Sequence, residues 1–238
     1  MSMTRKAGII AGILYLVGTM AGVLSVSQAI DGPEFLVRAF TNKNQVIVSA
    51  LFQLLMTILY TGFAICLYPI IRKQSKRLAI GFFGFRFVAA ALNILGVVVM
   101  LVILALSQNY VEAIAPDLAY YKILGALLRH ARDLINHVVM ILSYTLAGIM
   151  LYTIFYKAKL LPRWLSIWGF IGISSTVLAA ILVLFGLINI VTPAYIIFSL
   201  PLALQEMVLA IWLIFKGFNP SVVNVNRQFE VSSCESMQ

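Results

Sequence analysis

Two charged residues lie deep inside long apolar stretches of the sequence. Arg86 stands within the apolar run that starts at Leu78, and Glu206 stands within the run that ends at Phe215. Counted at about 1.5 Å per helical residue from the nearest basic residues, both would lie roughly 12–15 Å deep in a bilayer. An ionised group at that depth costs several kcal/mol unless it is paired or hydrated. The sequence therefore predicts a buried ion pair between Arg86 and Glu206.

Other polar residues should support this pair. Asn93 and Gln205 are expected to satisfy its remaining donors and acceptors, and Gln53 lies slightly further along the same polar route. Pro201, four residues before Gln205, should bend the helix beside the pair. Two interpretations stay open: a structural clamp that fixes helix packing, and a switch that breaks and remakes the pair when a proton or a substrate binds.

A second group of ionisable residues precedes the apolar run that starts at Val138. Its members are Arg129, His130, Arg132, Asp133 and His137. Arg129, Asp133 and His137 follow one another at four-residue spacing, which places them on one face of a helix. Two histidines and one aspartate are an incomplete metal-ligand set, and the two arginines would repel a cation, so no metal is expected. An anion or a lipid head group suits the arginines better, and a helix end that faces water needs no ligand at all.

The elements that carry these residues are apolar runs long enough to cross a membrane. Of the 238 residues 62% are hydrophobic and 11% are charged, whereas about a quarter are charged in a typical soluble domain. The predicted fold class is an all-α, polytopic transmembrane helical bundle with six spans. The spans are expected at residues 7–30, 46–71, 78–106, 138–156 (with the helix starting earlier, near 123), 165–190 and 195–215. Segment 31–45 is expected as a loop, and segment 107–121 as a connection that is either a loop or an interfacial helix.

The distribution of basic residues predicts how these spans are oriented. The net charge is +9, but the basic residues flank apolar runs and form no basic soluble module, which argues against nucleic acid. Most of them fall on one side, including the cluster at residues 72–77, when the N-terminus is placed inside. We therefore expect a plasma-membrane protein with both termini cytoplasmic: a membrane domain at residues 1–218 and a polar, disordered tail at 219–238. Ser27-Gln28-Ala29 has the form of a signal cleavage site, but the preceding apolar stretch is longer than in signal peptides.

Three stretches carry a resemblance to a known family. They are the Arg5-Lys6 start leading into Gly12-Ile13-Leu14-Tyr15-Leu16, the turn Leu161-Pro162-Arg163-Trp164-Leu165, and Glu206 followed by Ala210-Ile211-Trp212-Leu213-Ile214-Phe215-Lys216-Gly217-Phe218. In these, the chain resembles a bacterial family of multi-spanning integral membrane proteins catalogued as a domain of unknown function (type 4386), from about residue 6 to residue 218. The resemblance implies the topology and brings no reaction with it.

The function expected from these features is transport or exchange of a small or amphipathic molecule. The alternative is a non-catalytic membrane sensor or assembly partner, with the polar cluster as a recognition surface. An intramembrane lipid-modifying enzyme ranks last, because the sequence has no nucleophile motif, phosphate loop or metal motif. The expected partners are membrane lipids and a small-molecule or anionic ligand, and no cofactor is expected.

Overall fold

The computed structural model describes residues 3–112 and 118–219, and within them the chain is helical with no strand. Six helical runs are long and apolar enough to cross a membrane, as predicted. They are α1 (Met3–Leu24), α4 (Lys43–Arg72), α5 (Lys76–Glu112), the continuous run α6 (Leu118–Leu134), η2 (Ile135–Val139) and α7 (Met140–Ala158), α8 (Arg163–Leu184) and α9 (Pro193–Phe215). The protein is therefore a multi-pass membrane protein. The tail predicted to be disordered lies, apart from Asn219, outside the described residues.

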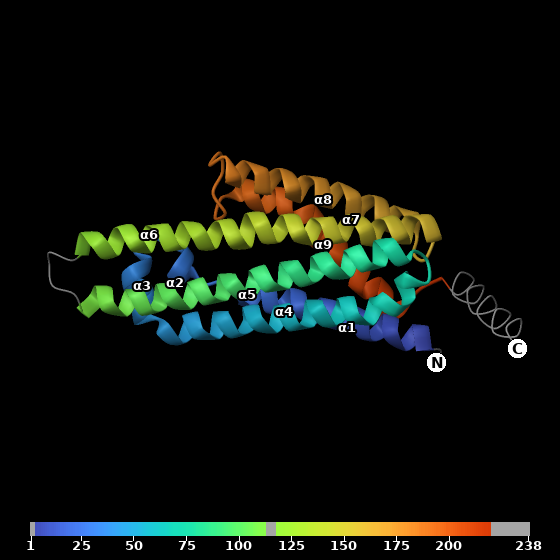
Figure 1. Ribbon diagram of the computed structural model, residues 1–238, viewed down its shortest axis with the longest axis horizontal. Helices are drawn as coiled ribbons and strands as arrows, with labels where there is room; N and C mark the ends of the chain where they lie inside the picture. Colours follow the sequence, from blue (N-terminus) through green and yellow to red (C-terminus); the bar gives the residue numbers. More distant parts are fainter. Residues whose placement is uncertain (1–2, 113–117, 220–238) are drawn as a thin grey trace, which may run out of the picture.

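The six spans close into a ring. Each span contacts the next one along the chain, and α9 returns to contact α1 (Figure 1). Arg5, in the first turns of α1, donates hydrogen bonds to the carbonyl oxygens of Leu213, Ile214 and Phe215 at 2.9, 2.6 and 2.9 Å. These bonds satisfy carbonyl groups that the end of a helix leaves without partners. The start of α1 and the end of α9 thus share one end of the bundle, which we call the terminal end; the opposite end is the far end.

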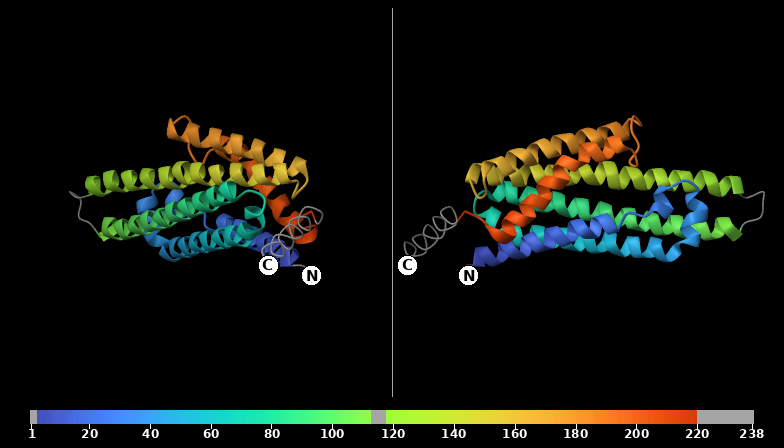
Figure 2. Two further views of the ribbon diagram at one scale, coloured as in Figure 1. Left: turned by 45° about the vertical axis from the view of Figure 1, so that its right-hand side comes forward. Right: turned by 180° about the vertical axis from the view of Figure 1, so that it is seen from behind.

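Glycines in α1 decide where it meets its two neighbours. A Cβ atom on Gly12 would lie 2.7 Å from the carbonyl oxygen of Ala210, so α1 and α9 cross there in direct backbone contact. A Cβ atom on Gly18 would lie 2.9 Å from the ring of Tyr60 on α4. Small residues allow this close approach of membrane helices. Because α1 turns to α4 after Gly12, α1 and α9 diverge toward the far end (Figure 2, right).

The far end is more helical than the sequence suggested. The expected connection at residues 31–45 contains the short helix α3 (Phe35–Thr41), preceded by α2 (Gln28–Asp31). Residues 107–112, also expected in a connection, continue α5, while 113–117 lie outside the described residues. The physical reason is burial: α3 contacts α5, and its Leu36 and Ala39 have exposures of 5% and 0%. In consequence α5 and α6 extend well past α8 and α9 (Figure 1).

Two predicted span ends need correction. The first span ends at Leu24, not at residue 30, since 22 helical residues already reach about 33 Å, enough to cross the hydrocarbon layer. The fifth ends at Leu184, not at residue 190. Gly186 has φ +68°, its N–H donates to Val183 and the N–H of Leu187 donates to Leu182. This is the hydrogen-bond pattern of a glycine helix stop.

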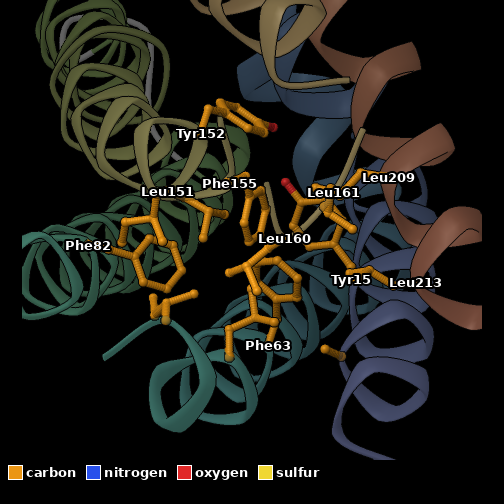
Figure 3. Packing of buried hydrophobic residues seen from close by; sticks show 14 of the residues in the cluster. Tyr15, Phe63, Phe82, Leu151, Tyr152, Phe155, Leu160, Leu161, Leu209 and Leu213 are labelled. Carbon is orange, nitrogen blue, oxygen red and sulfur yellow. The ribbon is translucent and has the colours of Figure 1, made fainter. Parts of the chain in front are cut away.

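Two apolar cores lie on either side of a polar layer. The larger core fills the terminal half with fully buried aromatic and leucine side chains, among them Tyr15, Phe63, Phe82 and Phe155 (Figure 3). A smaller core at the far end contains Ile30, Val46, Met100 and Ile103. Between them lie buried polar side chains, among them Gln53 and Thr57 on α4 and Arg86 and Asn93 on α5.

Candidate functional site

A cavity of about 260 Å³ opens in the polar layer. Its walls come from α4, α5, α7, α8 and α9, and none of the described lining residues belongs to α1. Most of its surface is apolar, but its polar members include Tyr60, Arg86, Tyr144, Tyr195, Ser199 and Glu206. The cavity therefore brings together the two charged residues that the sequence singled out, on helices that are far apart in the chain.

Both charged residues lie near the middle of the membrane. Arg86 is ten residues from the start of α5, and Glu206 is nine residues from the end of α9. Those separations correspond to depths of roughly 15 and 14 Å in a hydrocarbon layer about 30 Å thick. Their side chains are almost fully buried, with exposures of 5% and 8%. The two residues thus lie at similar distances from the helix ends at the terminal end of the bundle.

The guanidinium of Arg86 is surrounded by aromatic rings. Its Cζ atom lies 4.1 Å from the centre of the Tyr144 ring and 5.5–5.9 Å from four others. Those four rings are Tyr15, Tyr60, Phe63 and Phe82. The negative ring faces favour the cation, but they accept few hydrogen bonds. Within the described part of the chain no acceptor lies within hydrogen-bonding distance of its Nε and Nη1 atoms.

Tyr144 connects the arginine to Glu206. Its hydroxyl donates to Oε1 of Glu206 at 2.5 Å and lies 2.5 Å from the hydroxyl of Tyr15. Since the single Tyr144 proton goes to the carboxylate, Tyr15 is the donor in the second bond. Among the described residues, the ion pairs are those of Arg132 with Asp31 and Asp133. The direct Arg86–Glu206 ion pair that the sequence predicts is therefore replaced, in this conformation, by a contact through Tyr144.

The expected supporting residues have other partners. Asn93 accepts from Gln53 and donates to Thr57, both at 2.6 Å, which ties α5 to α4. It lies seven residues from Arg86, about 10 Å along the helix, too far to reach the guanidinium. Gln205 accepts from Tyr152 at 2.6 Å and donates to the carbonyl of Leu165. Consecutive helical residues point about 100° apart, so Gln205 faces α7 and α8 while Glu206 faces the cavity.

The arginines of the second cluster hold the far end together. Arg132 pairs with the carboxylate of Asp31 at 2.6 Å, and Asp133 lies 3.8 Å from the same guanidinium. Arg129 donates to the backbone carbonyls of Asp31 and Gly32 at 2.5 and 3.0 Å. Donors spent on α2 in this way are not available to an external anion. His130 is exposed to the surroundings. No group of three or more potential metal ligands occurs among residues 3–112 and 118–219.

His137 has a different partner from the arginines and contacts a residue of the cavity wall. It lies in η2, a π-helical turn whose extra residue redirects the side chains that follow. Its Nδ1 atom is 2.9 Å from the hydroxyl of Tyr195, one of the lining residues. Residues predicted to share one helical face therefore contact different helices: Arg129 contacts α2, and His137 contacts α9.

Sequence reasoning missed the tyrosines of the site. Tyr15, Tyr60 and Tyr144 stand in the middle of apolar runs, where a phenol hydroxyl needs a hydrogen-bond partner. The need for a partner could have marked these tyrosines as candidate site residues, because it applies to any polar group in hydrocarbon. Thr57 gave no such signal, since a threonine hydroxyl can bond to its own helix, as it does here with the carbonyl of Gln53.

Comparison with known proteins identifies one family. No curated protein and no solved structure matches the chain. The family model described as Domain of unknown function (DUF4386) matches residues 10–217. That range contains Arg86, Glu206, every tyrosine of the cavity and most of all six spans. The chain therefore belongs to the DUF4386 family of membrane proteins.

Proposed function

We propose that the protein binds a small amphipathic molecule in the cavity beside Arg86 and Glu206 and transports or exchanges it across the membrane. The observation that carries this proposal is the cavity itself, which sits at mid-membrane depth and is lined by both charges. A purely structural clamp would be expected to close on itself in a dry contact. A charged, mostly apolar pocket is instead suited to a ligand with one polar end.

The surroundings of the cavity favour access from one side. Its α9 wall runs from Tyr195, in the first turn, to Glu206, roughly 16 Å along the helix. On this half α9 has left α1, and the cavity has no wall from α1 (Figure 2, right). On the terminal side the larger aromatic core lies across the path (Figure 3). Access from one side at a time is the requirement of an alternating-access carrier.

The two charges supply a switch for such a cycle. In the present conformation they are held apart by Tyr144. Direct contact between Arg86 and Glu206 would draw α5 and α9 together and shrink the cavity between them. A ligand that occupies Arg86 would oppose that closure. Binding would thus be coupled to the opening of the site, because the ligand has different affinities for the two conformations.

The charge pattern supports an orientation. Lys159, Arg163 and Lys216 surround a second cavity, of about 550 Å³, at the terminal end. Basic residues gather on the cytoplasmic side of membrane proteins, so the terminal end would face the cytoplasm of a cell whose plasma membrane holds the protein. The cavity would then be reached from the outer leaflet or the outer surface.

Flux measurements in proteoliposomes test the proposal. A panel of labelled small and amphipathic molecules is offered to liposomes that contain the wild type, Glu206→Gln or, as a matched control, Glu112→Gln at an exposed position of α5. We expect one class to exchange faster with the wild type than with empty liposomes, with Glu206→Gln at least about tenfold slower and Glu112→Gln unchanged. Equal rates for wild type and Glu206→Gln across the panel would refute the proposal. Saturable binding without any flux would favour the alternative function, a non-catalytic membrane sensor.

A further inference from the structure

We infer that the ligand is an amphipathic anion: an acidic head group, carboxylate or phosphate, that binds Arg86 while its apolar chain leaves the cavity toward lipid. This inference rests on the proposed function and names its substrate class. It is carried by the hydrogen-bonding needs of the cavity walls and by the side on which the cavity opens.

The unmet need inside the cavity is for acceptors. Arg86 has an exposure of only 5% and lines the cavity. Two of its nitrogen atoms, Nε and Nη1, make no hydrogen bond within the described chain. A buried guanidinium is normally satisfied by a carboxylate or phosphate, which accepts strong charge-assisted hydrogen bonds from it. Glu206 already accepts the hydroxyl of Tyr144. A cationic head group would meet Arg86 as a like charge, and neither a cationic nor a purely donating head group would supply the acceptors that its guanidinium lacks.

The remaining cavity surface suits an alkyl chain. Beyond Arg86 the wall surface is mostly apolar, and small and aliphatic side chains contribute to it, among them Met56, Ala89, Ala90 and Ile141. Ala203, on the α9 wall, is itself exposed. Its neighbour Leu204 is 48% exposed on the outside of the ring, where lipid chains would lie. A volume of about 260 Å³ holds a head group and a few carbons. A longer chain would leave past the exposed Ala203, on the half of α9 that has diverged from α1.

Anion binding also explains why two opposite charges share the site without touching. An acidic head group on Arg86 takes the position that Glu206 would occupy in a direct ion pair. The ligand and Glu206 would compete for one guanidinium, so the site would be open when the anion is bound and closed when the two residues pair. This makes Arg86 the binding residue and Glu206 the group that displaces the ligand.

A competition experiment with matched probes tests the inference. The wild-type protein is placed in phosphatidylcholine nanodiscs with radiolabelled decyl phosphate, and binding to empty nanodiscs is subtracted. The competitors are decanoate, decan-1-ol, decyltrimethylammonium and inorganic phosphate. We expect decanoate to compete at least about tenfold better than the alcohol or the ammonium compound, as hydrogen bonds to a charged group allow. Inorganic phosphate alone should compete weakly, since it lacks the chain.

Variants then locate the binding group. Arg86→Gln should lower the affinity for decyl phosphate by about 10- to 100-fold and abolish the preference for anions. Arg86→Lys, which keeps the charge but not the planar donor geometry, should lie in between. Arg163→Gln, at the terminal end, is the control and should bind like the wild type. If Arg86→Gln does not fold, the relative strength with which the competitors displace decyl phosphate from the wild type still tests the inference.

Three results would overturn the inference: equal or better competition by decyltrimethylammonium or decanol, unchanged decyl phosphate binding in folded Arg86→Gln, or inorganic phosphate competing as well as decanoate. The last would leave a site for a free anion rather than an amphipathic one. If anions bind as expected but no probe crosses the membrane, the transport proposal fails while this inference stands. If an uncharged molecule is transported independently of Arg86, the transport proposal stands and this inference fails.

Discussion

The contact through Tyr144 can be tested by removing a single oxygen atom. Tyr144→Phe keeps the ring, whose centre lies 4.1 Å from the Arg86 guanidinium, and so preserves the cation–π contact. It removes the hydroxyl that donates to Glu206 and that accepts from Tyr15, both at 2.5 Å. The carboxylate then loses a donor at a position with 8% exposure. We therefore expect the variant to fold but to be less stable.

The expected size follows from the number and kind of bonds lost. A hydrogen bond to a charged group contributes about 1.5–3 kcal/mol in soluble proteins, whereas interhelical bonds in a membrane protein average about 0.6 and reach about 1.7 kcal/mol. Two short bonds in a buried site place the loss at about 1–2 kcal/mol. For a chain of this size each kcal/mol shifts the melting temperature by roughly 2–4 °C. The predicted decrease in Tm is therefore about 2–8 °C.

Tryptophan-fluorescence melting of the purified protein in detergent measures this decrease. Tyr156→Phe is the matched control, because Tyr156 lies on the same helix, is 39% exposed, and should melt within about 1 °C of the wild type. A double-mutant cycle of Tyr144→Phe with Glu206→Gln should show a coupling of about 1 kcal/mol. Tyr144→Phe melting with the wild type, or strictly additive effects in the cycle, would refute the contact.

Three further substitutions test the packing around the site. Gly12→Leu inserts a side chain where Cβ alone would lie 2.7 Å from the oxygen of Ala210; it should separate the ends of α1 and α9 and lower Tm by several degrees, and spin-label distances unchanged from the wild type would contradict that crossing. Asn93→Leu leaves the Gln53 amide without its 2.6 Å acceptor and should cost about 1 kcal/mol in thermal melts, a value near zero being the opposing result. Arg132→Gln removes the ion pair to α2 and should speed hydrogen exchange in residues 28–41 while exchange in α8 stays constant; equal protection throughout would speak against the clamp.

The membrane architecture was predictable from composition and run length. Six apolar runs of sufficient length require six helices, since a chain in hydrocarbon must satisfy its backbone hydrogen bonds within each segment. The glycines of α1 predicted a close helix contact but not its partner, because the same spacing serves α9 at Gly12 and α4 at Gly18. Helix boundaries were less predictable: α3 forms because Ala39 gains burial in the small core with Met100 and Ile103 of α5, a tertiary effect absent from local sequence.

The site was predictable in its charges and not in its connections. Arg86 and Glu206 stood out because hydrocarbon penalises charge, and that penalty needs no knowledge of the fold. Their partners depend on helix rotation, which sequence alone does not give. Gln205 illustrates the limit: it is adjacent to Glu206 in sequence but points to Tyr152. His137 likewise contacts Tyr195 because it lies in a π-helical turn, which the sequence pattern did not predict.

Blocking the cavity without touching its charges tests the central claim most directly. Ala203 lines the cavity, while Leu204, the next residue, faces away from it and is 48% exposed. Binding of labelled decyl phosphate should fall at least about tenfold in Ala203→Trp, whose indole would fill the space beside Arg86, and should be unchanged in Leu204→Trp. Full binding by folded Ala203→Trp, or equal losses in both variants, would contradict a ligand site between α4, α5 and α9.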